Sequence, residues 1–157
     1  MIGGREIDVL NLFPTQFVYH TKVENHTQIK QKYLQIIQEN LEENKFLYES
    51  SKTWNCDVVS SFFGNKRKNL KMFCDDFCDE VIWKPFKLLK EELHQTIPMY
   101  DFPEKFMLSE IWYNAYEKDY FQEYHKHGQS NFSGIYLIDL HETNKTVFMQ
   151  DNPPSII

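Results

Sequence analysis

The sequence lacks a long apolar run, an excess of basic residues and a rich supply of cysteine. No run approaches the roughly 18 apolar residues of a membrane-spanning helix, and the N-terminus shows no signal-peptide pattern. The net charge of −6 argues against a broad nucleic-acid-binding surface. With three cysteines and no secretory pattern, we expect reduced thiols and a cytoplasmic protein without a membrane or nucleic-acid partner.

What the sequence does contain is enough apolar and aromatic material for one hydrophobic core. Its 157 residues match the size of one domain, and 41% of them are hydrophobic, which suffices to bury a core. We therefore expect a single domain over residues 1–157. Its first part, 1–100, is predicted to hold a strand and the helices, and 104–157 the remaining strands.

Two stretches of the first part have the spacing of amphipathic helices. Between Asn25 and Asn44, apolar residues recur at steps of three and four, which places them on one helix face. A second pattern runs from Asn69 to Leu93, and Pro85 within it predicts a kink or two abutting helices. Segments 106–116 and 132–140 are predicted strands. Helices followed by strands are typical of an α+β fold with an antiparallel sheet.

The sharpest chemical signal is a His-x-His pair between the last two predicted strands. Residues i and i+2 of a strand point to the same face, so His125 and His127 are expected to bind one metal ion together. Two neutral imidazoles suit Fe, Zn, Cu or Ni and leave coordination positions open. Glu123 is either a ligand, an outer partner of an imidazole or a solvated residue. The alternative is that both histidines are exposed turn residues.

Around this pair, the sequence resembles a family of 2-oxoglutarate/Fe(II)-dependent oxygenases. The family pattern is similar to Asn-x-Tyr, Gln-x-x-His-x-His-Pro and Ser-Gly-Val-Tyr-Tyr. The matching residues here are Asn114-x-Tyr116, Phe121-Gln122-x-x-His125-x-His127 and Ser133-Gly134-Ile135-Tyr136. Leu12-Phe13-Pro14-Thr15 also resembles the opening strand of the family. The resemblance is dense over residues 112–137 and thin elsewhere.

The resemblance implies a double-stranded β-helix (jelly-roll) core, with the N-terminal helices packed on its sheet, and hydroxylase-type chemistry with Fe(II) and the cosubstrate 2-oxoglutarate. By position, His125 matches the first iron ligand. His127 stands where related oxygenases carry a carboxylate. Asn114, Tyr116 and Gln122 match polar positions expected to line the cofactor pocket. The substrate is not specified.

The sequence also departs from the family pattern. Gly128 replaces the proline after the pair, and 30 residues follow His127, enough for about two of the roughly eight strands of a jelly-roll. The later His141 is expected to be a solvated turn residue, and no arginine follows Arg67 to bind the 2-oxoglutarate carboxylate. We therefore expect an incomplete oxygenase-like domain, possessing open strand edges that favour self-association.

Two other functions fit these residues. A cupin-like metal protein that uses no 2-oxoglutarate explains the His-x-His pair equally well, although residues 129–133 lack the glutamate of the usual cupin pattern. A non-catalytic interaction protein fits the absence of the distal ligands. Whether the chain is an enzyme is left open by the sequence.

Overall fold

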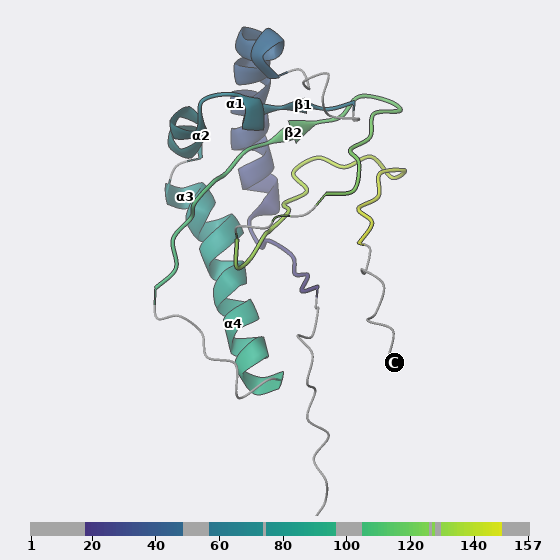
Figure 1. Ribbon diagram of the computed structural model, residues 1–157. Helices are drawn as coiled ribbons and strands as arrows, with labels where there is room; N and C mark the ends of the chain where they lie inside the picture. The colour runs from purple at the N-terminus through teal and green to yellow at the C-terminus, as the bar shows by residue number, and fades with distance from the viewer. Residues whose placement is uncertain are drawn as a thin grey trace, which may run out of the picture.

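The computed structural model describes residues 18–48, 57–73, 75–96, 105–125, 127 and 130–148 (Figure 1). The expected opening strand at residues 12–15, and also Cys74 and Gly128, lie outside these ranges. Helices form most of the regular structure within them. The helices of the described ranges include none that is long and apolar enough to cross a membrane.

Helix α1 (His26–Tyr48) confirms the first predicted helix and extends past its expected end. The backbone N–H of Ile29 donates to the carbonyl of Asn25 at 3.0 Å, which begins the helical hydrogen-bond ladder. Ile29, Tyr33 and Ile37 are all buried. They lie on one face because residues four apart on a helix share a face. The opposite face is solvated.

Helix α2 (Lys66–Met72) begins earlier than the pattern from Asn69 predicted. The reason is a cap: the side-chain oxygen of Asn65 accepts hydrogen bonds from the backbone N–H groups of Arg67 and Lys68, at 3.0 and 3.3 Å. A single 3₁₀ turn, Ser61–Phe63, precedes it.

The second predicted helical pattern continues through α3 (Asp75–Phe77), a π-helical segment (Cys78–Trp83) and α4 (Lys84–Thr96). These pieces follow one another as a single column in Figure 1. Pro85 has no N–H to donate to the carbonyl of Val81, and the wider π-helical turns lie just before it. The predicted irregularity at Pro85 is therefore found as a change of helix type.

The expected jelly-roll is wrong. The described residues contain one two-stranded antiparallel sheet, in which β1 (Val59–Ser60) pairs with β2 (Asn114–Ala115). The bond from Ser61 N–H to the Tyr113 carbonyl at 3.1 Å extends the pairing, and a bond from Asp57 N–H to the Phe121 carbonyl at 2.9 Å joins the same segment to the chain beyond the turn. A strand requires a second backbone as its partner, and among the described residues segment 57–61 pairs with 113–115. The predicted strand over 132–140 has no assigned ladder.

The core is centred on Tyr33, which is 0% exposed. Its ring contacts those of Phe77 and Phe73, with centroids 4.7 and 6.0 Å away, and its hydroxyl donates to Asp76 Oδ1 at 2.6 Å. Tyr136 of the second half packs against this cluster. Helix α1 is thereby joined both to the second helical region and to the extended segments.

A buried polar set fixes how the sheet sits on the helices. Asn69 Nδ2 donates to the Ser61 carbonyl at 2.9 Å, while Ser61 Oγ accepts the Tyr113 N–H at 3.0 Å. Ser60 Oγ donates to Asn114 Oδ1 at 2.6 Å. Each buried side-chain nitrogen or oxygen in the described ranges has a partner. Because an unpaired buried polar group is costly, these bonds favour a single register between the two segments.

We predict that Tyr33→Ala lowers the free energy of unfolding by about 3–5 kcal/mol, because it removes a large aromatic side chain from the centre of the core. Urea denaturation measures the loss. Gln28→Ala, at an exposed position of the same helix, is the matched control and is expected to change stability by less than about 0.5 kcal/mol. A loss below about 1 kcal/mol for Tyr33→Ala would show that the core is centred elsewhere.

Segment 135–138 alternates between the core and solvent. Tyr136 and Ile138 pack against the core, whereas Ile135 and Leu137 are 66% and 47% exposed. Apolar side chains on both sides are typical of a strand covered on both faces. The expected self-association remains a prediction, and we expect it to occur through the exposed row formed by Ile135 and Leu137.

We predict that the sedimentation coefficient of the chain rises with protein concentration. The double variant Ile135→Lys, Leu137→Lys is expected to remain monomeric over the same range, because it places two charges in the exposed row and leaves the inward side chains unchanged. Sedimentation velocity distinguishes the cases. A monomer at every concentration, or equal association of the variant, contradicts the prediction.

Candidate functional site

The His-x-His pair follows a tight turn after β2. The N–H of Tyr120 donates to the carbonyl of Glu117 at 3.1 Å, and Asp119 adopts a left-handed conformation with φ of 66°. Aspartate tolerates this conformation better than most residues. The turn returns the chain to segment 57–61, where the Phe121 carbonyl pairs with Asp57. The histidines therefore lie on a segment anchored just before them.

The two histidines converge through their Nε2 atoms. These atoms are 3.1 Å apart, and the ring centroids are separated by 4.9 Å. His125 Nδ1 lies 3.0 Å from the carbonyl oxygen of Glu123. A carbonyl only accepts, so Nδ1 carries the proton and neutral His125 has its lone pair on Nε2. The backbone of Glu123 thus selects the tautomer in which His125 Nε2 can bind a metal ion.

The spacing fits two neighbouring ligands of one ion. Imidazole nitrogens bound at about 2.1 Å lie about 3.0 Å apart at a right angle and about 3.4 Å apart at the tetrahedral angle. The Nε2 atoms of His125 and His127 fall between these values. In the metal-free chain His127 Nε2–H donates to the lone pair of His125 Nε2, so an ion bound between them replaces this hydrogen bond and requires the His127 proton to be on Nδ1.

His127 is supported by aromatic packing and a lowered pKa. The indole of Trp112 stacks on its imidazole, with ring centroids 5.8 Å apart and planes inclined by 21°. Burial lowers the pKa of His127, the nearby His125 lowers it further, and Glu110 acts in the opposite direction. The lowered pKa favours the neutral imidazole, which is the form that binds metals.

Asn114, Tyr116 and Gln122, the predicted pocket-lining residues, are brought into one hydrogen-bonded network. Tyr116 Oη donates to Gln122 Oε1 at 2.7 Å. Asn114 Nδ2 lies 3.3 Å from both Tyr116 Oη and Gln122 Oε1. Ser60 completes the network by binding the other end of the Asn114 amide. The resemblance thus named three side chains that lie together, while their role in cofactor binding remains a prediction.

Other metal-ligating residue types do not join the pair. Within the described ranges, no group of three or more His, Cys, Asp and Glu side chains could hold a metal ion. Glu123 contributes its backbone carbonyl, and its side chain is exposed. His141 Nδ1 lies 2.9 Å from Thr143 Oγ1 in a local turn, as expected of a solvated turn residue. The candidate site thus has two protein ligands in the described part of the chain.

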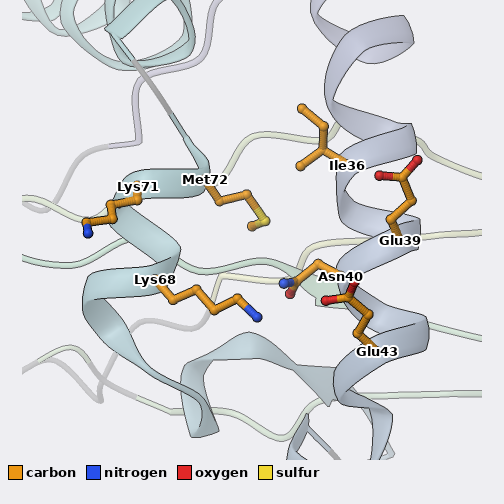
Figure 2. A pocket seen from close by; sticks show the side chains of 7 residues that line it. All are labelled: Ile36, Glu39, Asn40, Glu43, Lys68, Lys71 and Met72. Atoms are coloured by element: carbon orange, nitrogen blue, oxygen red, sulfur yellow. The ribbon is translucent and has the colours of Figure 1, made fainter.

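A separate cleft lies between α1 and α2. Figure 2 shows Lys68 extending from α2 toward α1. The cleft is lined by Ile36, Glu39, Asn40, Glu43, Lys68, Lys71 and Met72. None of the candidate site residues lines it, and its acidic and basic side chains balance one another.

The sequence reasoning missed the residues that support the pair. Glu110 and Trp112 precede Asn114 at steps of two, and this spacing would place all three on one face of a strand. An aromatic residue in a predicted strand, however, indicates core packing by default. Ser60 gave no signal, because it lies 54 residues from Asn114 in sequence. Comparisons with known proteins found no matching family model, curated protein or solved structure.

We predict that His127 in the metal-free protein titrates below its ordinary pKa of 6.5, and that His125→Ala raises this pKa part of the way back by removing one of the two lowering effects. Because the folded pKa is the lower one, protonation favours the unfolded chain. The contribution of His127 to stability is therefore present above about pH 6.5 and is lost as the pH falls through the lowered pKa.

NMR titration of the imidazole protons in chelator-treated protein measures this. A His127 resonance that titrates at or above the ordinary value would contradict the assignment. An unchanged pKa in His125→Ala would show that His125 is not one of the causes.

Proposed function

We propose that the chain binds Fe(II) through His125 and His127 and acts as a 2-oxoglutarate-dependent oxygenase of the hydroxylase type. The observation that carries the proposal is the 3.1 Å approach of the two Nε2 atoms within the motif that resembles this enzyme family. The proposal concerns the ligands and their chemistry and does not depend on a jelly-roll fold.

The two imidazoles are proposed as neighbouring ligands of one Fe(II). Two protein ligands leave positions for a bidentate cosubstrate and for oxygen, and the iron supplies the oxygen activation when bound. The Glu123 carbonyl orients one imidazole, and Trp112 packs on the other. The chain's own contribution is to favour the neutral form of His127 and to bring the two Nε2 atoms to one point.

The proposed pair differs in charge from one that includes a carboxylate. Two neutral imidazoles leave the full positive charge of Fe(II) at the site. This charge favours an anionic cosubstrate such as 2-oxoglutarate, while the absence of an anionic ligand weakens binding of the ion itself. Glu110 provides a nearby negative charge, since it acts to raise the pKa of His127.

The network of Asn114, Tyr116 and Gln122 is proposed to bind 2-oxoglutarate. Tyr116 Oη and Asn114 Nδ2 both donate to Gln122 Oε1, and a carboxylate oxygen that replaces this acceptor would receive the same two hydrogen bonds. Tyr116 is 42% exposed, so a ligand can reach its hydroxyl without opening the core. Ser60 keeps the Asn114 amide oriented by bonding its oxygen.

We predict that anaerobic addition of Fe(II) and 2-oxoglutarate to the chain produces a visible metal-to-ligand charge-transfer band, because 2-oxoglutarate coordinates the Fe(II) bound by the two histidines. His125→Ala and His127→Ala are expected to abolish the band. His94→Ala, at an exposed position on α4, is the matched control and should leave it intact. Tyr116→Phe is expected to raise the 2-oxoglutarate concentration at which the band reaches half of its maximal absorbance.

The outcomes separate the candidate functions. A band that persists in His125→Ala overturns the proposed ligands. Binding of Fe(II) by the wild type with no effect of 2-oxoglutarate favours the cupin-like alternative. Absence of any divalent-metal binding in calorimetry favours the non-catalytic interaction protein.

A further inference from the structure

We infer that Trp112 is a positioning residue for the metal pair: its indole face holds the His127 imidazole in the orientation that directs Nε2 at His125. The inference rests on the proposed metal binding and goes beyond it by assigning the group that presets one ligand. The two rings are nearly parallel, inclined by 21°, with centroids 5.8 Å apart.

The backbone that follows Trp112 is fixed by hydrogen bonds of the next two residues, Tyr113 and Asn114. Tyr113 donates its N–H to Ser61 Oγ and accepts the Ser61 N–H at its carbonyl. Asn114 is paired with Ser60 in the ladder and through its side chain. The Cα of Trp112 is therefore set by the same register that positions the rest of the site.

The indole itself is held from a second side. The ring of Phe62 meets it edge-on, with centroids 5.3 Å apart and planes inclined by 66°. Lys66 Nζ lies 5.4 Å from the Phe62 ring centroid and also forms an ion pair with Glu110, two residues before Trp112. These contacts form a continuous series from Lys66, through Phe62 and Trp112, to His127. Both indole contacts come from described residues on different parts of the chain.

His127 needs such support more than His125 does. The Glu123 carbonyl fixes the ring of His125 through Nδ1. His127 is exposed and belongs to no assigned helix or strand, and in the described part of the chain its ring packs against those of Trp112 and His125. An imidazole free to rotate about χ1 and χ2 loses rotamer entropy when it binds a metal, whereas a stacked one has lost part of it already.

The stack also favours the metal-bound state electrostatically. Coordination draws electron density from the imidazole and leaves it more positive. The face of an indole carries negative charge density and attracts such a ring, in the same way that it attracts a cation. Trp112 therefore stabilises the metal-bound form of His127 more than the free form.

The test is a titration with Co(II), a coloured ion suited to imidazole ligands, on the 157-residue chain. Groups that orient metal ligands typically contribute about 10–100-fold to metal affinity. We expect Trp112→Leu to weaken Co(II) binding by at least about 10-fold and to alter the visible Co(II) spectrum. Trp112→Phe retains an aromatic face and is expected to keep most of the affinity. Trp83→Leu, in the π-helical segment, is the matched control and should change neither.

A second readout follows the indole directly. Co(II) bound to His127 lies close to Trp112 and should quench its fluorescence. We expect Co(II) to lower the tryptophan fluorescence of the wild type and of Trp83→Leu. In Trp112→Phe this decrease should be missing. A role of Trp112 in folding alone does not predict this pattern, and Trp112→Phe supplies the test if the leucine variant does not fold.

The inference is overturned if Trp112→Leu folds and binds Co(II) with unchanged affinity and an unchanged spectrum. It is equally overturned if Trp112→Phe retains the full quenching of the wild type. If wild-type protein binds no Co(II), the proposed metal site itself fails, and the inference falls with it. Metal binding by the wild type thus separates failure of the function from failure of the positioning role.

Discussion

The structure depends on one backbone pairing, between segment 57–61 and residues 113–121. A hydrogen bond from Ser61 to Tyr113 continues the ladder, and one from Asp57 to Phe121 ties the chain after the turn to the same segment. Asn69 of α2 holds the Ser61 carbonyl, so the pairing is attached to the helices as well. Because a shift of one residue would turn every side chain to the other face, this register determines which residues face one another at the candidate site.

The consequences of the register reach the histidines in two ways. On one segment, Trp112 packs against His127 and Asn114 joins the polar network with Gln122. On the other side of the turn, Phe121 is anchored to Asp57, and the chain then leads into the histidine pair. The short sheet thereby gives the two candidate ligands defined partners.

The helices could be predicted from the sequence because their signal is local. The apolar stripe containing Ile29, Tyr33 and Ile37 needs no knowledge of what covers it, and the buried residues are those of the stripe. The strands could not be predicted in the same way. Alternating residues in 132–140 indicate an extended chain, but a strand needs a partner backbone, and the described residues provide none for that segment.

The candidate site divides along the same line. The predicted convergence of His125 and His127 is found at their Nε2 atoms, although the strand from which it was predicted is not assigned at residues 121–125 or at His127. The supports come from distant sequence positions, such as Ser60 and Phe62, which no local pattern connects with the pair. Trp112 was visible in the motif, but the sequence did not distinguish a ring packed in the core from one packed on a ligand.

The central claim is that both imidazoles bind the same ion. X-ray absorption at the zinc edge, with one equivalent of Zn(II) bound, counts imidazole ligands through their characteristic multiple scattering. We expect two imidazole nitrogens at about 2.0 Å in the wild type and one in His125→Ala. A wild-type spectrum with one imidazole or none, or with a count that His125→Ala leaves unchanged, would contradict the claim.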